Sequence, residues 1–194
     1  MFSGIISHVG NIEKSTGVGL TVSAPRDFLK KLKVGTSVAV QGACLTVVER
    51  GKKTFKVEIM PETRVRTNLR TLSRGSLVNL ELPVTPNTLL SGHIVQGHVD
   101  DTARLIRITR QKNARVLGFS VLPALSMYIV DKGPVAVNGV SLTVIKAKRG
   151  HFTVGIVPHT WRSTALRTLK LNDRVNVEVD VIGKYVGKFL KKRT

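Results

Sequence analysis

Short segments in which apolar and polar residues alternate recur along the whole chain. The first half contains SVAVQ, CLTVVE, TFKVEIM and SLVNLELPV, and the second half contains PVAVNG, SLTVIK, HFTVGIV and RVNVEVDVI. Alternation with a period of two predicts β-strands, and the Gly, Asn, Lys and Pro residues between the segments mark turns. Several short strands at a spacing of roughly 8 to 12 residues predict a closed barrel or a sandwich.

A helical periodicity is confined to a few places. The segments APRDFLKKLK and LPALSMYIVDK have helix-compatible spacing, and TRVRTNLRTL and WRSTALRTLK each predict a short helix or turn. The end of the chain predicts an amphipathic helix, with an apolar stripe of Ile182, Tyr185, Val186, Phe189 and Leu190 and an opposite face bearing Lys184, Lys188 and Lys191. Such a helix either folds back on its own domain or packs against another chain, and the second option gives it a role in oligomerisation.

An internal repeat covers most of the chain. SVAVQGACLTVVE recurs as PVAVNGVSLTVIK, so that Gly42 matches Gly139 at an offset of 97 residues. The alignment continues without a gap, and about 20 of about 44 positions from Val38 to Glu81 are identical. This period is the size of a small domain rather than of a solenoid unit. The chain is therefore expected to contain two homologous domains, 1–93 and 94–182, and a terminal oligomerisation helix at 183–194.

The charge of the chain widens the range of possible partners. There are 31 Lys and Arg residues against 12 Asp and Glu residues, which gives a formal net charge of +19. Such an excess is compatible with nucleic acid, with anionic small molecules or with a solvated basic surface. The basic residues are spread along the chain, however, and the aromatic residues, at 5%, are not interleaved with them. This pattern disfavours a stacking platform for single strands, and no nucleic-acid partner is expected.

Other function classes are disfavoured on composition. No stretch approaches the roughly 18 apolar residues of a membrane span, so no membrane partner is expected. The single cysteine, Cys44, excludes an internal disulfide framework and a structural zinc site made of cysteines, and no Cys/His cluster suggests a metal. The N-terminus has neither the basic region nor the apolar run of a signal peptide, which favours a cytoplasmic protein.

Eight segments, in this order along the chain, carry a resemblance to a known family: MFSGII, VAVQGACLTV, PETRVRTNL, GHIVQGHVD, YIVDKGPVAVNGVSLTV, FTVGIVPHT, STAL and VNVEVDVIGKYV. Together they span nearly the whole chain, and the family that they resemble is riboflavin synthase. The resemblance implies an all-β fold of two tandem six-stranded Greek-key barrels and a C-terminal helix around which a homotrimer assembles. It implies an active site between the N-terminal barrel of one subunit and the C-terminal barrel of its neighbour. The implied reaction is the dismutation of two 6,7-dimethyl-8-ribityllumazine molecules to riboflavin and 5-amino-6-(D-ribitylamino)uracil, without a cofactor, and association with lumazine synthase is a further option.

The resemblance also assigns substrate-binding residues to each barrel. In the first barrel these are Phe2, Gly4, Ile5, Ile6, Ser37, Cys44, Leu45, Thr46, Glu58, Ile59, Met60, Pro61, Glu62 and Thr63. In the second barrel they are Gly97, His98, Val99, Lys132, Ser141, Leu142, Thr143, Ile156, Val157, Pro158, His159, Thr160 and Trp161. Cys44 and Thr46 are two residues apart on a strand and point the same way.

Catalytic candidates follow from the need to remove and return a proton, which calls for a group that titrates near neutrality or a polarised hydroxyl. His98, in the doubled Gly-His motif, is the expected base or relay, with Ser141 and Thr143 opposite; Cys44 and Asp180 complete the candidate set.

Two features depart from the family pattern. His159 stands where the family usually has Glu, and Trp161 with Arg162 replaces a smaller apolar pair, so the polar contacts of the second pocket are left undecided by the resemblance.

A non-catalytic lumazine- or flavin-binding protein of the same fold is the alternative function. The intact CLT and SLT triplets favour two working pockets.

Overall fold

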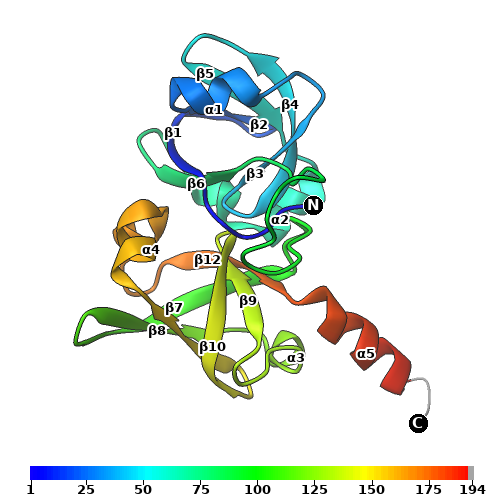
Figure 1. The fold of residues 1–194 in the computed structure, drawn as a ribbon, viewed down its shortest axis with the longest axis vertical. Coiled ribbons are helices and arrows are strands. Elements are labelled where there is room, and N and C mark those ends of the chain that lie inside the picture. Colours follow the sequence, from blue (N-terminus) through cyan, green and yellow to red (C-terminus); the bar gives the residue numbers. More distant parts are fainter. Residues whose placement is uncertain (192–194) are drawn as a thin grey trace.

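The computed structural model describes residues 1–191, and the end of the expected terminal helix, residues 192–194, lies outside the described residues. Two closed six-stranded antiparallel barrels follow one another along the chain (Figure 1). The strands of the first barrel are β1 (His8–Ser15), β2 (Gly19–Ser23), β3 (Ser37–Val40), β4 (Ala43–Arg50), β5 (Thr54–Glu58) and β6 (Leu77–Glu81). Those of the second are β7 (Asp101–Gln111), β8 (Ala114–Ser120), β9 (Pro134–Val137), β10 (Val140–Lys148), β11 (His151–Ile156) and β12 (Arg174–Val179).

Both barrels have the same strand order. The first closes as β1-β2-β5-β4-β3-β6, and the second repeats this cycle with each strand number raised by six. The prediction of two six-stranded barrels related by duplication is therefore confirmed. The predicted domain boundaries at 93 and 182 stay a prediction, because segments of each half pair with the other half, as in the bridge between Phe2 and Val95.

Each barrel has its own apolar core, formed by the inward-facing residues of the alternating strands. Short helices occupy the segments in which helical spacing was expected. These are α1 (Arg26–Lys31), α2 (Pro61–Arg66), α3 (Pro123–Ser126) and α4 (Pro158–Ser163), with the 3-10 turns η1 (Asn68–Thr71) and η2 (Ala165–Thr168). Helix α1 buries Phe28 and Leu29 against the first core, which explains the two apolar positions in an otherwise charged segment.

The contact between the barrels is nearly two-fold symmetric. The side-chain amide of Asn79 donates to the Asn138 carbonyl at 2.9 Å, and that of Asn176 donates to the Gln41 carbonyl at 2.8 Å. Gly42 and Gly139 meet backbone to backbone between these pairs, both with positive φ. Because the amides are buried and satisfied, this contact fixes one orientation of the two barrels.

Helix α5 (Val181–Lys191) extends away from the second barrel (Figure 1). It touches that barrel through Gly187, where an added Cβ would lie 2.7 Å from the Tyr128 ring. The apolar stripe expected from the sequence is confirmed as one face of a helix, but it does not fold back on the domain. Its five side chains are 52–65% exposed.

Candidate functional site

Two strands, β4 and β10, are each covered by a segment that crosses from the other half of the chain. The backbone N–H of Ser141, on β10, donates to the carbonyl of Gly4 at 2.8 Å. At the equivalent place in the first barrel, the N–H of Cys44, on β4, donates to the carbonyl of Gly97 at 2.8 Å. The loop before β1 therefore lies on the second barrel, and the loop before β7 lies on the first.

Glycine is required at both crossings. Gly4 has φ +75° and Gly97 has φ +79°, in the region that side chains disfavour. A Cβ added to either would lie 2.6 Å from the Cβ of Ser141 or Cys44, respectively. A side chain at either position would push the crossing segment off its strand.

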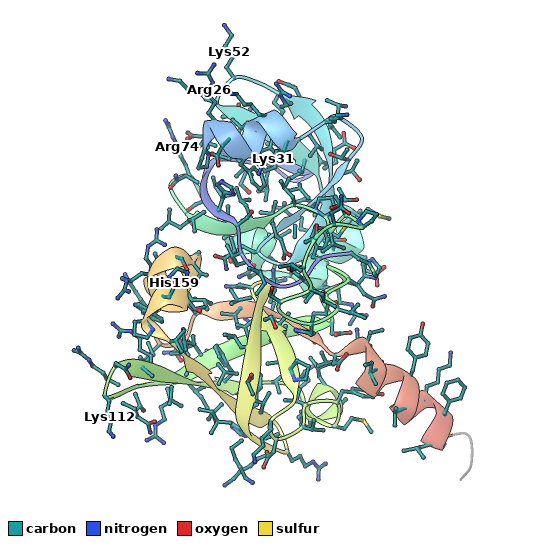
Figure 2. All side chains as sticks on the ribbon, in the orientation of Figure 1. Arg26, Lys31, Lys52, Arg74, Lys112 and His159 are labelled. Atoms are coloured by element: carbon teal, nitrogen blue, oxygen red, sulfur yellow. The ribbon has the colours of Figure 1, made fainter. Side chains whose placement is uncertain are left out.

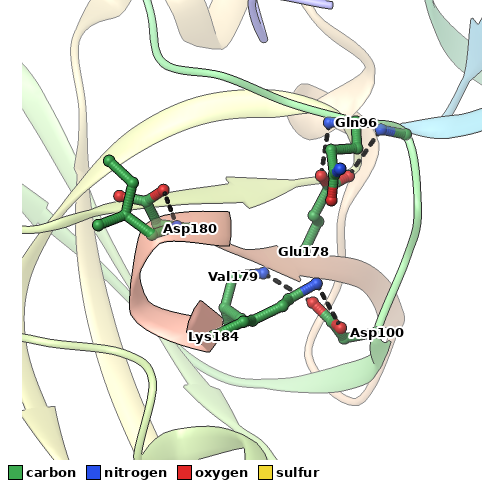
Figure 3. A network of polar contacts seen from close by, with 8 residues as sticks. Gln96, Asp100, Glu178, Val179, Asp180 and Lys184 are labelled. Carbon is green, nitrogen blue, oxygen red and sulfur yellow. Dashed lines mark hydrogen bonds and ion pairs between the residues drawn. The ribbon is translucent and has the colours of Figure 1, made fainter. Parts of the chain in front are cut away.

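Two buried carboxylates hold the crossing segments. Glu81, 5% exposed, accepts from the backbone N–H groups of Ser3 at 2.7 Å and Gly4 at 3.1 Å. Its repeat equivalent, Glu178, 3% exposed, accepts from Gln96 at 2.6 Å and Gly97 at 2.9 Å (Figure 3). Burial raises the pKa of both carboxyl groups, and the backbone hydrogen bonds oppose this change. Neither glutamate was predicted from the sequence, although a Glu in the same strand position of both repeats was a usable signal.

The first-barrel pocket is a cavity of about 470 Å³. The expected residues Cys44, Met60, Glu62, Thr63, Gly97, His98 and Val99 line it together, and so do Ala43, Arg66, Thr67, Gln96, Asp100 and Lys184. A thiol, a carboxylate, a hydroxyl and an imidazole thus face one space. Such a set can hydrogen-bond both donor and acceptor groups of a polar ring.

Other residues expected in this pocket lie elsewhere. Leu45 and Ile59 belong to the first-barrel core, and Ser37, Thr46 and Glu58 lie beside one another on β3, β4 and β5. Thr46 and Glu58 are exposed. Phe2 is buried between the barrels, against Ala39, Val95 and Ala136. Pro61 is the first residue of α2.

Beside Ser141 on the second barrel lies a histidine, His93, that was not predicted as a site residue from the sequence. The Nδ1 atom of His93 lies 2.7 Å from the Ser141 hydroxyl, while its Nε2 atom is buried without a hydrogen-bond partner. Burial lowers the pKa of His93, and the nearby Asp180 carboxylate opposes this change. A neutral His93 can therefore accept the Ser141 hydroxyl proton at Nδ1. The Gly-His repetition contained this residue, but nothing in it distinguished His93 from His98.

The structure corrects the expected grouping of residues. Gly4 was assigned to the first pocket and Gly97 to the second, but their hydrogen bonds place each on the other barrel. Within the chain, His98 consequently lies beside Cys44 rather than beside Ser141. The error follows from treating each repeat as a closed unit, whereas the first segment of each repeat completes its neighbour.

The remaining second-barrel candidates are scattered around the barrel. Leu142 and Ile156 are buried in its core; Thr143 and Lys132 are exposed, and the Lys132 N–H donates to the Val144 carbonyl. Ile5 is half exposed, and Ile6 packs against this core. Val157, His159 and Thr160 lie at the start of α4, whereas Pro158 and Trp161 line a different cavity.

Helix α5 is joined to the first-barrel pocket by one ion pair. The Nζ atom of Lys184 lies 2.7 Å from Asp100, which also accepts from the Val179 N–H at 3.0 Å (Figure 3). Asp180 accepts from the Ile182 N–H at 3.1 Å and so caps the start of the helix. Since Lys184 lines the pocket, the position of α5 is coupled to the site.

The described part of the chain contains no group of three His, Cys, Asp or Glu residues that could hold a metal ion. None of the helices in residues 1–191 is long and apolar enough to cross a membrane.

Comparison with known proteins identifies the domain family of both halves of the chain. Residues 3–83 and 96–180 each match the family model of the lumazine binding domain. The chain therefore contains a tandem pair of such domains, and each contributes a segment that crosses to the other. A crystal structure of LumP complexed with riboflavin superposes with a TM-score of 0.87 at 26% identity, covering 93% of this chain and all of that one.

The curated relatives identify the protein family within the proteins that contain this domain. The riboflavin synthase of Bacillus subtilis is 40% identical over 99% of this chain and 91% of its own length. That of Saccharomyces cerevisiae is 36% identical over 97% and 85%. The chain belongs to the riboflavin synthase family.

Proposed function

We propose that this enzyme converts two molecules of 6,7-dimethyl-8-ribityllumazine into riboflavin and 5-amino-6-(D-ribitylamino)uracil. A four-carbon unit passes from one lumazine to the other, so the two products together contain all atoms of the two substrates. The observation that carries the proposal is the pair of equivalent pocket walls, with Cys44 beside Gly97 and Ser141 beside Gly4. A reaction between two copies of one compound requires two similar binding sites.

The main contribution of the protein is to hold the two substrates against each other, which can lower the barrier by roughly 7–11 kcal/mol. In this proposal, the first-barrel pocket binds one lumazine between Cys44, Thr63 and His98. The second lumazine lies against Gly4, Ile5 and Ser141, with Thr143 and Lys132 nearby on the outer face of the barrel. A hydroxyl polarised by the neutral His93 is suited to moving the proton of an acidic methyl group.

The direct test is to mix the purified protein with the lumazine alone and follow riboflavin fluorescence. The expected result is one riboflavin for every two lumazines consumed, with large losses of turnover in His98→Ala and in Ser141→Ala. Lys52→Ala, an exposed substitution far from both pocket walls (Figure 2), is the matched control and should keep full turnover. No riboflavin from the wild-type protein would overturn the proposal.

We also propose a homotrimer in which the first-barrel pocket of one subunit faces the second-barrel pocket of its neighbour. The exposed stripe of α5 supports this, because side chains such as Phe189, 65% exposed, form an apolar face that nothing among residues 1–191 covers. Phe189→Glu is expected to yield monomers in sedimentation equilibrium and to lose turnover, while Lys188→Gln, on the polar face, stays trimeric. A trimer that survives Phe189→Glu contradicts assembly through the helix.

A second candidate function is the binding of a lumazine or flavin without turnover, since LumP, of similar fold, has been crystallised in complex with riboflavin. Tight lumazine binding without riboflavin formation would favour it. A cytoplasmic location and association with a lumazine synthase complete the proposal. Cell fractionation tests the first, and co-sedimentation with purified lumazine synthase tests the second.

A further inference from the structure

A second cavity, of about 350 Å³, lies between the β7–β8 hairpin and helix α4. Its lining residues are Arg110, Asn113, Ala114, Arg115, Ile156, Pro158, Trp161 and Arg162. In Figure 2, Lys112 marks the tip of this hairpin and His159 marks α4, on the same side of the second barrel.

This cavity lies on the face of α4 opposite to the face that corresponds, in the repeat, to the α2 side of the first-barrel pocket. In the first barrel, the pocket is lined by Met60, Glu62 and Thr63, whose repeat equivalents are Val157, His159 and Thr160. None of these three lines the second cavity, which is instead lined by Pro158, Trp161 and Arg162. Positions 158, 161 and 162 share one face of a helix, and positions 159 and 160 lie on the other.

The cavity concentrates positive charge without compensation. Three of its eight lining residues are arginines, and none is Asp or Glu. In the described part of the chain, the guanidinium groups of Arg110, Arg115 and Arg162 have neither an ion pair nor a hydrogen bond within the protein. Like charges around one small space repel one another, and an anion between them would relieve this repulsion.

One of the three arginines is held by an aromatic ring. The guanidinium carbon of Arg115 lies 4.3 Å from the centroid of the Trp161 ring, in a cation–π contact. Both side chains are half-buried. Stacking fixes the plane of the guanidinium group while leaving its N–H groups free at the edge, the orientation in which arginine binds an oxyanion bidentately.

In the first barrel, another residue fills the position of Trp161. Its repeat equivalent is Arg64, whose guanidinium donates to the Thr16 carbonyl at 2.6 Å and ties α2 to the shorter β1–β2 hairpin. In the second barrel, Trp161 makes no such bond and the hairpin is longer, since β7 has 11 residues against 8 in β1. The stacked pair of Arg115 and Trp161 is therefore specific to the second repeat.

We propose that this cavity binds a multiply charged phosphate compound, either a phosphate ester or a pyrophosphate. Three guanidinium groups match an oxyanion with at least two negative charges better than a monoanion. The site is separate from the lumazine pockets and goes beyond the reaction proposed above.

The test uses the one tryptophan of the chain as its reporter. Pyrophosphate is titrated into the full-length protein at constant ionic strength, with Trp161 fluorescence and isothermal calorimetry as independent readouts. The expected result is saturable binding that weakens at least tenfold in Arg115→Gln and in Arg162→Gln. Arg149→Gln, which removes the same charge from an exposed position of the same barrel, should bind as the wild type does.

Four outcomes would overturn the proposal. One is the absence of saturable binding by calorimetry in the wild-type protein; another is equal weakening in Arg149→Gln, which would reveal a general charge effect. The third is competition by 6,7-dimethyl-8-ribityllumazine, which would make the cavity part of the substrate site. Citrate in place of pyrophosphate distinguishes a phosphate site from a site for any polyanion, and equally tight citrate binding would contradict the phosphate assignment.

Discussion

Replacing Gly42 by alanine tests whether the backbone contact between the barrels holds the molecule together. An added Cβ would lie 2.5 Å from the backbone N and 2.7 Å from the Cα of Gly139, so no flexible side chain can move aside. The φ of +79° adds strain of about 1–2 kcal/mol for an L-residue. Forcing atoms into a closely packed place costs about 1–3 kcal/mol more. We expect Gly42→Ala to lower the free energy of unfolding by about 2–5 kcal/mol.

The matched control is Gly35→Ala in the same barrel. Gly35 has φ +83° but nothing within 4 Å of its hypothetical Cβ, so it carries the strain without the clash. Any gain from a stiffer unfolded chain is common to both variants. The clash alone costs about 1–3 kcal/mol, and each kcal/mol lowers the melting temperature of a chain of this size by about 2–4 °C. The calorimetric midpoint of Gly42→Ala should therefore lie about 2–12 °C below that of Gly35→Ala. Equal midpoints would refute the view that the glycine contact, rather than local strain, makes this position intolerant.

Three further predictions concern the titrating groups. In Glu81→Gln, urea unfolding from pH 4 to 7 should show a cost of substitution that falls as the pH rises. The pKa of Glu81 is raised in the folded protein above its usual value of 4.5, so the wild-type side chain stabilises the fold most below pH 4.5. This contribution is lost as the pH rises through the folded pKa. A cost of substitution that grows with pH would contradict this reasoning. Asp180→Asn should lower the pKa of His93 further, as followed by NMR, since it removes the carboxylate that favours the charged ring; an unchanged or higher value would count against the contact. Lys184→Met should cost about 1 kcal/mol in thermal unfolding and raise the pKa of Glu178, and an unchanged pKa in a carboxyl NMR titration would show that the two charges do not interact.

Much of the architecture could be predicted from sequence because it rests on local patterns. The repeat from Val38 to Glu81 predicted two barrels, and the spacing of Ile182, Tyr185 and Phe189 predicted α5. Both signals are periodicities within one strand set or one helix. They carry no information about which face meets which partner.

The candidate site could be predicted less well, because its parts meet only through tertiary contacts. The crossing of Gly4 to Ser141 depends on how the barrels dock, and sequence spacing within one repeat cannot reveal it. Similarly, His93 and His98 both follow a glycine, and only the fold places His93 beside Ser141 and His98 beside Cys44.

The crossed segments also define what the smallest complete unit of this fold is. One repeat contains a pocket wall, at Cys44 or Ser141, but the segment that covers it belongs to the other repeat. A single copy would thus leave its wall open and its own first segment without a strand to join. Two copies satisfy each other, so a single repeat would be complete only as a pair, and one chain that holds both copies keeps that partnership permanent while leaving each half free to differ in sequence.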